Sequence, residues 1–381
     1  ARDLANFDGL ATTGPALETA LWAEVYAGVN MANMVINSTF EPPTALQTEF
    51  EQLIGEAHAM RALAYLDLVR LFAQHYSFTP DASHPGVPIV LESRMTNRPA
   101  RNTVAEVYGQ IISDLETGIT LMTMSRGPYM FTREAAQALL SRVYLYMEDW
   151  GGALSMAAAV INSGKYSLVS GQAYVDQFVA GGSSEAILEI QNTGADNSGS
   201  SSLGGMYRAS GYGDYLPAKD LLDLIDPDDV RMKMFVVDPI LTGIYASHRV
   251  NKWPTPANMD NVPVIRLSEV YLNRAEANVR LGNHAAAQAD LNLIRQRGLA
   301  NAPDVTSAGP DLLDEILRER RIELGYEGHR IFDLTRHRLD VVRVDCTGQV
   351  CVYAYPGPYF ILPIPQPEID ANPNITQNPG Y

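Results

Sequence analysis

The sequence predicts a mostly α-helical fold in which an array of helical hairpins supports an irregular, loop-rich half with a few short strands. Three observations carry this prediction. Apolar residues recur at helical spacing over much of the chain, two alanine-rich segments repeat at an offset of 134 residues, and a Gly- and Ser-rich stretch at 192–215 has no period. The 381 residues are 46% hydrophobic and 19% charged, which is an ordinary globular composition.

The N-terminal third contains three expected helices. Residues 22–36 and 49–76 place apolar side chains at steps of three and four, as an amphipathic helix does. Arg61 interrupts the second apolar face, and we expect it to serve as an internal charge partner. A third helix, predicted to start after Thr103, has Glu106 three residues after this N-cap, which is the pattern of a capping box.

The internal repeat relates residues 133–161 to residues 269–294. Each segment has the pattern of two alanine-rich helices joined at a polar turn, and the repeat aligns Trp150 with His284. Small residues where the two helices cross resemble the tetratricopeptide pattern. Because one hairpin cannot bury its apolar face alone, we expect three or four hairpins, including the N-terminal pair, in one curved right-handed array.

The chain is expected to form a single domain, 1–381, with three parts. The helical scaffold should comprise residues 16–163 and 263–336, and the irregular, ligand-binding part residues 164–262. An extended tail should follow at 337–381. A chain of this length is long enough for one large core.

Short strands are expected at 186–190, 245–253, 341–344 and 352–355. Cys346 and Cys351, the only cysteines of the chain, enclose a Gly-containing turn between the last two. A disulfide is expected if the protein is exported, whereas in the cytosol the pair would be two free thiols. A zinc site would need two further ligands, and none lies at suitable spacing, so no metal site is expected.

The C-terminal segment 363–381 contains five prolines. Proline fixes φ and removes a backbone donor, so we expect this segment to run extended and to form no helix. Ile364, Ile369 and Ile375 recur along it. Their spacing predicts that the segment lies against the body of the protein.

Charge and motifs exclude several classes of function. The chain has 44 acidic and 28 basic residues, a net charge of −16 and no basic run, so a phosphate backbone would repel it and no nucleic-acid partner is expected. No apolar stretch reaches the roughly eighteen residues of a membrane-spanning helix. The sequence also lacks the metalloprotease, nucleophile-elbow and phosphate-loop motifs, and no cofactor is expected.

The charged block at 319–333 allows two interpretations. Its carboxylates are compatible with the acid and base of a glycosidase, or with an ion-pair network that locks the last helices together. Arginine and glutamate alternate at spacings suited to pairing, and an acid with a raised pKa would have fewer arginines around it. The network is the favoured interpretation, and we expect no catalysis.

The stretch 192–215 is the candidate ligand-binding segment. Tyrosine combined with Ser, Gly and Asn is typical of polar recognition surfaces, and sugars present C–H faces that stack on aromatic rings. The same aromatic side chains would also serve to pack the irregular part onto the helices. The expected ligand-binding residues are Tyr207, Tyr212, Tyr215 and Trp253, with Arg249 and Asn251 as hydroxyl partners and Tyr76 and Phe78 as a second wall.

Motifs along nearly the whole chain match those of one known family. They are Trp22-x3-Tyr26-x3-Asn30, Gly55-Glu-Ala-x3-Arg61-Ala62, Arg101-x-Thr103-Val-x-Glu106, the segments 135–150, 265–277 and 319–336, and the proline-rich tail. On these residues the chain resembles the SusD/RagB family, which are nutrient-binding lipoproteins on the outer surface of Bacteroidetes-type bacteria. The resemblance implies four tetratricopeptide-like units that support an irregular half carrying the ligand site.

The resemblance also implies where the protein acts and with what. It implies a lipidated N-terminal Cys in the outer membrane, facing the cell exterior, and a SusC-type TonB-dependent transporter over which the protein sits as a lid. The chain opens at Ala1 without that Cys, and we expect a trimmed start.

Two functional interpretations stay open at this point. The first is a non-catalytic glycan-binding subunit that delivers oligo- or polysaccharide to the transporter. The second is a lid whose ligand is a peptide or another nutrient and which acts mainly through protein contact. An exposed cluster of coplanar aromatic rings near 207–215 and 253 would favour the first.

Overall fold

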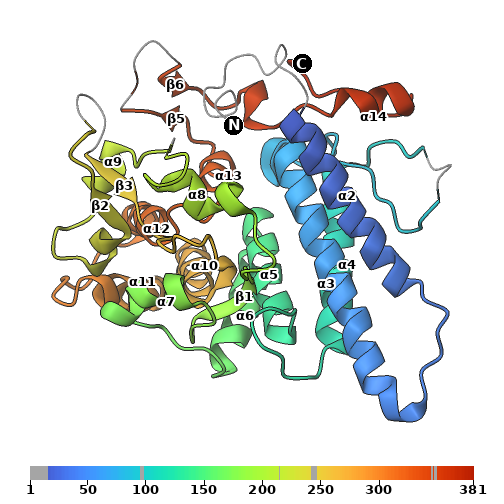
Figure 1. Ribbon diagram of the computed structural model, residues 1–381, viewed down its shortest axis with the longest axis horizontal. Coiled ribbons are helices and arrows are strands. Elements are labelled where there is room, and N and C mark those ends of the chain that lie inside the picture. The colour runs from blue at the N-terminus through green and yellow to red at the C-terminus, as the bar shows by residue number, and fades with distance from the viewer. Residues whose placement is uncertain (1–15, 95–97, 214, 242–246, 345, 347–349) are drawn as a thin grey trace.

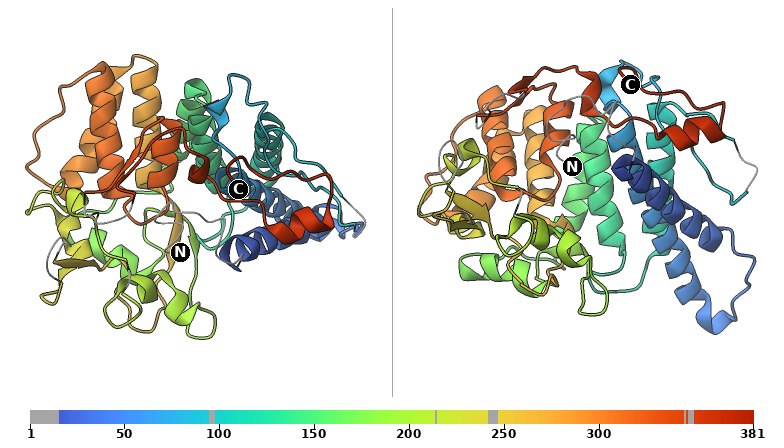
Figure 2. Two further views of the ribbon diagram at one scale, coloured as in Figure 1. Left: turned by 90° about the horizontal axis from the view of Figure 1, so that it is seen from above. Right: turned by 45° about the horizontal axis from the view of Figure 1, so that its top comes forward.

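Antiparallel helices dominate the computed structural model (Figure 1). The structure describes residues 16–94, 98–213, 215–241, 247–344, 346 and 350–381. The irregular part, coloured green to yellow, forms a layer along one side of the helices (Figure 2). The predicted fold class is therefore confirmed, whereas the division into scaffold, irregular part and tail stays an interpretation.

The first three described helices are α2 (Ala16–Ile36), α3 (Gln47–Phe72) and α4 (Val104–Leu121). Arg61 of α3 is buried and donates to Asp114 at 2.6 and 2.9 Å and to Asn33 at 2.7 Å. This confirms its role as an internal charge partner that ties the three helices together. Helix α3 ends earlier than predicted, and Tyr76 lies in the short 3₁₀ turn η2 (Tyr76–Phe78).

The N-terminus of α4 carries the predicted capping box. The Thr103 hydroxyl accepts from the Glu106 backbone N–H at 3.2 Å, and the Glu106 carboxylate accepts from the Thr103 N–H at 2.8 Å. Two of the unpaired amides at the start of the helix are satisfied in this way.

The repeat forms two helical hairpins, and the predicted register is confirmed. Their helices are α5 (Arg133–Tyr146), α6 (Trp150–Asn162), α10 (Leu267–Arg280) and α11 (His284–Gly298). Helices α6 and α11 begin at the aligned positions Trp150 and His284, and the small residues Ala153 and Ala287 are fully buried at the crossings. Helices α12 (Gly309–Glu323) and α13 (Arg330–Arg336) follow.

The irregular part contains more regular structure than predicted. Helix α7 spans Gln172–Ala180, and η3 (Gly199–Ser201) and α8 (Leu203–Tyr207) fall inside the stretch expected to be a loop. Helix α8 forms because the Ser202 hydroxyl caps it by accepting from the Gly205 N–H at 3.1 Å. The remaining elements here are α9 (Lys219–Leu222), η4 (Val230–Met234), β2 (Phe235–Val237) and β3 (His248–Val250).

All described sheets are antiparallel strand pairs. The predicted strand β1 (Ala186–Ile190) pairs with β4 (Val262–Arg266), which the sequence did not predict, and β2 pairs with β3. The strand expected at 245–253 is limited to β3, and its first two predicted positions lie outside the described residues. Strands β5 (Val341–Val342) and β6 (Val352–Tyr353) form the predicted C-terminal hairpin, and a disulfide joins Cys346 to Cys351.

The C-terminal tail corrects one prediction and confirms another. It contains α14 (Gln366–Ala371), preceded by η5 (Pro358–Phe360), so the expectation of a wholly extended tail was wrong. Pro367 lies in the first turn of α14, where its missing N–H costs no helical hydrogen bond. Ile364 and Ile375 are buried in the main core, as predicted. None of the described helices is both long and apolar enough to span a membrane.

Candidate functional site

A pocket of about 640 Å³ lies where the irregular part meets the C-terminal helices. Helices α8, α9 and α13 lie close together around it (Figure 1). Leu203, Leu216 and Leu221 line one side, and the loop 325–331 between α12 and α13 lines the other.

Aromatic rings form the wall between these two sides. Tyr207, at the end of α8, stacks on Trp253 with ring centroids 5.6 Å apart and an interplanar angle of 20°. Tyr326 meets Tyr207 edge-on at 5.3 Å, and Tyr215 does so at 6.0 Å. Three of the predicted aromatic residues therefore lie together, and Tyr326 joins them.

The aromatic residues differ in what they offer to a ligand. Trp253 is only 1% exposed and Tyr207 covers one of its faces, so the indole supports the wall and does not present the stacking face that we expected. Tyr207 and Tyr326 are half-buried. Burial raises the pKa of Tyr207 to about 12, so its hydroxyl stays neutral and can both donate and accept.

The remaining predicted residues of the irregular part have other surroundings. Tyr212 is 61% exposed, and the Arg249 guanidinium donates to Asp238 at 2.5 Å and to the Gly213 carbonyl at 2.7 Å. Asn251 is half-buried next to the pocket wall. These three are absent from the described lining of the pocket, so the structure does not bring them to the site.

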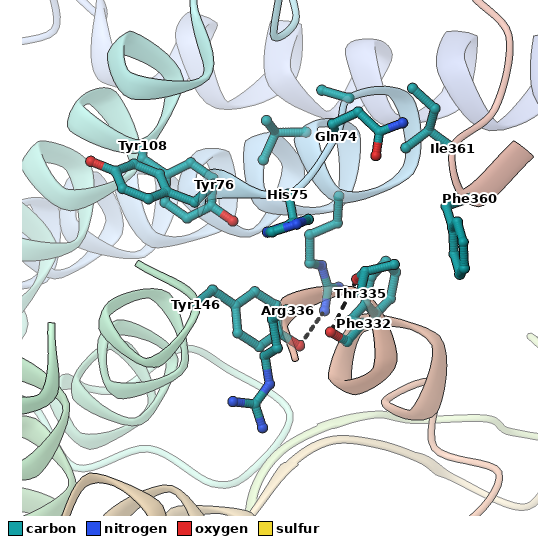
Figure 3. Close-up of a pocket in the computed structure, with 13 residues that line it drawn as sticks. Gln74, His75, Tyr76, Tyr108, Tyr146, Phe332, Thr335, Arg336, Phe360 and Ile361 are labelled. Atoms are coloured by element: carbon teal, nitrogen blue, oxygen red, sulfur yellow. Dashed lines mark hydrogen bonds between the residues drawn. The ribbon is translucent and has the colours of Figure 1, made fainter. Parts of the chain in front are cut away.

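Tyr76 and Phe78 do not form a second wall of this pocket. Tyr76 packs edge-on against Tyr108 at 4.9 Å and lines a separate cavity of about 20 Å³ beside Arg336 (Figure 3). Such a cavity has room for about one water molecule, not for a sugar. Phe78 lines a third space of about 350 Å³, together with Arg101 and residues of the C-terminal tail.

Buried ion pairs hold the pocket loop in place. Glu327 accepts from Lys252 at 2.5 Å and from two nitrogens of Arg266, both at 2.8 Å. The Lys252 ammonium also donates to the Gly325 carbonyl at 3.0 Å, so the residue next to Trp253 is tied to both ends of the Tyr326 turn. This turn is unusual because Tyr326 itself adopts a left-handed conformation, with φ of 67°.

The same ion pairs continue below the pocket as the network predicted for residues 319–333. Glu323 accepts from Arg266 at 3.0 Å, from Arg231 at 3.3 Å and from Arg297. Strand β4, η4 and helices α11 and α12 are thereby joined. Arg330, which we expected to belong to this network, pairs with none of the described carboxylates.

The electrostatics of the site differ from those of a glycosidase. Burial alone would raise the pKa of Glu327, but Arg266 and Lys252 outweigh it and lower the pKa below its ordinary value. Burial and three arginines act in the same opposing way on Glu323, and its pKa is also lowered. Glu327 is the single carboxylate in the described lining of the pocket, and a general acid needs the opposite shift.

Sequence reasoning missed Tyr326. The available signal was an aromatic residue between Gly325 and Gly328, which is typical of a tight turn that exposes one side chain. The surrounding charges drew the interpretation toward ion pairs instead, and both features are present.

Comparison with known proteins places the chain in a family. The model described as "SusD family" matches residues 230–381, and the model described as "Starch-binding associating with outer membrane" matches residues 11–145. A SusD-like protein of Formosa agariphila is 26% identical over 377 residues, covering 83% of this chain and 71% of the relative. The starch-binding protein SusD of Bacteroides thetaiotaomicron is 33% identical over 128 residues, covering 32% of this chain and 22% of the relative.

Solved structures show the same likeness in three dimensions. The crystal structure described as a putative sugar binding protein from Bacteroides vulgatus has a TM-score of 0.89 and 34% identity, covering 100% of this chain and 88% of that one. A SusD superfamily protein from Bacteroides thetaiotaomicron has a TM-score of 0.84 and 30% identity, covering 94% and 85%. Sequence identity of this size over whole chains, with the fold shared and both ends of the chain matched, means that the protein belongs to the SusD/RagB family.

Proposed function

We propose that this protein captures glycan at the outer face of the outer membrane, leaves it chemically unchanged and delivers it to a SusC-type TonB-dependent transporter. The printed descriptions of its relatives support the ligand class, since they include a starch-binding protein and a putative sugar binding protein. The description of one matching family model supports association with the outer membrane. Attachment through an N-terminal lipid is part of the same proposal.

The aromatic-walled pocket is the observation that carries the proposal. Its volume of about 640 Å³ is typical of small-ligand sites, and tyrosines of both α8 and the 325–331 loop line it. Sugar rings pack their C–H faces on such rings, while the hydroxyls reach the polar tips. We therefore place the glycan at Tyr207 and Tyr326, with Trp253 as the support behind them.

The partner in this proposal has its own support on the surface. The hairpin of α2 and α3 extends beyond the neighbouring helices (Figure 1) and exposes a group of large apolar side chains. Exposed apolar groups of this kind mark protein contacts more often than solvated faces. The group consists of Met31, Met34, Val35, Phe40, Leu46, Leu53 and Met60.

Isothermal titration against a panel of soluble oligo- and polysaccharides tests the ligand. We expect a glycan to bind and Tyr207→Ala and Tyr326→Ala each to weaken it by about 1 kcal/mol or more, because a packed aromatic ring is lost. Tyr212→Ala is the matched control, since Tyr212 is exposed outside the pocket, and it should bind as the wild type does.

Each other result has a clear meaning. Binding that both pocket variants retain would place the glycan site elsewhere on the protein. If no glycan in the panel binds, the ligand is a peptide or another nutrient, and protein contact becomes the main function.

A further inference from the structure

Arg330 stands out among the charged residues around the pocket. It is the first residue of α13, it is exposed, and it lines the pocket without a carboxylate partner among the described residues. The carboxylates nearest to it in charge are Asp220 and Asp333. Asp220 binds Arg321 at 2.8 Å, and Asp333 binds Arg320 at 3.2 Å and Arg336 at 2.8 Å.

The other titratable side chains of the described lining do not balance this charge. Glu327 is already neutralised by Lys252 and Arg266, both of which contact it at hydrogen-bonding distance. Arg321 is balanced by Asp220. Burial lowers the pKa of His329 to about 4, so this imidazole is neutral at pH 7. The pocket thus presents one uncompensated positive charge in a chain whose net charge is −16.

This charge has a natural ligand chemistry. A guanidinium carries a fixed fork of donors that matches a carboxylate or a sulfate group, and such charge-assisted pairs are stronger than neutral hydrogen bonds. Arg330 and the rings of Tyr207 and Tyr326 line one pocket. A ligand held there can therefore place a sugar ring on the tyrosines and an anionic substituent on the arginine.

Resting on the function proposed above, we propose that the glycan is anionic and that its charged group binds Arg330. Uronic acid carboxylates and sulfate esters share the required chemistry. A neutral glycan would leave the guanidinium unpaired and would gain only the aromatic contacts.

Matched ligand pairs test this proposal by isothermal titration of the full chain. The first pair is oligogalacturonate and its methyl ester, and the second is a sulfated galactan oligosaccharide and its desulfated form. Each is titrated at low and high NaCl into the wild type, Arg330→Gln and Arg94→Gln. Arg94 is a matched control because it is an exposed arginine that does not line the pocket.

We expect one charged ligand to bind about tenfold or more tightly than its neutral partner, since a charged hydrogen bond contributes about 1.5–3 kcal/mol. The preferred pair tells carboxylate from sulfate. Arg330→Gln should remove this preference, whereas Arg94→Gln should keep it, and salt should weaken only the charged ligand. A circular dichroism melt of Arg330→Gln confirms that the variant is folded.

Two results would overturn the proposal, and they differ. If neutral and charged partners bind equally and Arg330→Gln changes nothing, the anionic preference is wrong and glycan capture stands. If neither member of any pair binds, and no neutral glycan of the wider panel does, glycan capture fails as well.

Discussion

At the residue scale, Trp253 shows how one side chain organises the site without meeting the ligand. Its indole is buried behind Tyr207, and its neighbour Lys252 holds the 325–331 loop through Glu327. The residue therefore links the packing of the irregular part to the position of the tyrosines. A contact role and a support role are separable by experiment.

Trp253→Ala should lower the free energy of unfolding by about 3–5 kcal/mol, because the substitution leaves a large cavity in a buried position. Urea unfolding followed by circular dichroism measures this change. Tyr212→Ala, at an exposed aromatic position, should change it by less than about 0.5 kcal/mol. A destabilisation of Trp253→Ala below about 1 kcal/mol would show that the indole is not the support described here.

Glu269 makes the stability of the protein sensitive to acid. It is buried in α10, and Arg142 of α5 binds it with two bonds of 2.6 Å. Burial would raise its pKa, but Arg142, His329 and Arg320 together lower the pKa from 4.5 to about 2. A lowered folded-state pKa adds stability that is complete above the unfolded value and is lost as the pH falls through the folded value.

We therefore expect the melting temperature to fall between about pH 4.5 and pH 2, with Glu269 contributing roughly 3 kcal/mol of the loss. Melts recorded from pH 7 to pH 2 test this directly. Glu269→Gln should be destabilised at pH 7 and should show a shallower decline over the same range. An unchanged pH profile in this variant would contradict the assignment.

At the element scale, the helices are fixed by short-range signals and by buried pairs that join one helix to the next. The Thr103 capping box starts α4, and the Arg61–Asp114 pair then holds α4 against α3. The Arg142–Glu269 pair does the same between the two repeat hairpins. Local sequence thus sets where a helix begins, and the pairs set which helix it contacts.

Thr103→Ala should destabilise the protein by about 1 kcal/mol, because the first turn of α4 loses its side-chain acceptor. Thr117→Ala is the matched control, since that hydroxyl bonds to the Ser113 carbonyl in the middle of the same helix. Thermal or urea unfolding compares the two variants. Equal losses would mean that the capping box contributes nothing specific.

At the scale of the whole molecule, the ligand pocket and the exposed apolar hairpin belong to different regions. The pocket lies between the irregular part and the C-terminal helices, whereas the hairpin is the N-terminal edge of the helical array (Figures 1 and 2). A protein that binds a nutrient and a transporter at once needs two such separate surfaces. This arrangement is consistent with the proposed delivery function.

Met34→Ser combined with Phe40→Ser should reduce co-purification with the SusC-type transporter at least about fivefold, because a partner surface would lose apolar contacts. Glycan binding and the melting temperature should stay unchanged, since both side chains are exposed. Ile240→Ser, at an exposed apolar position of the irregular part, is the control. Undiminished co-purification would move the contact to another face.

Among individual residues, the sequence predicted the aromatic wall only in part. Tyr207, Tyr215 and Trp253 lie together as expected, but Tyr76 and Phe78 line separate cavities, and Tyr326 comes from a segment some seventy residues beyond Trp253. Composition identifies a segment rich in recognition residues. It does not show which distant loop will face that segment.

What the sequence determined by itself was the helical array: the periodic apolar faces, the register that aligns Trp150 with His284, and the capping box at Thr103. These features depend on residues close together in the chain, so their spacing is sufficient evidence. Only the tertiary structure decided the site. The left-handed turn at Tyr326, the link from Lys252 to Glu327 and the unpaired charge of Arg330 arise from contacts between segments far apart, whose distances no local spacing encodes.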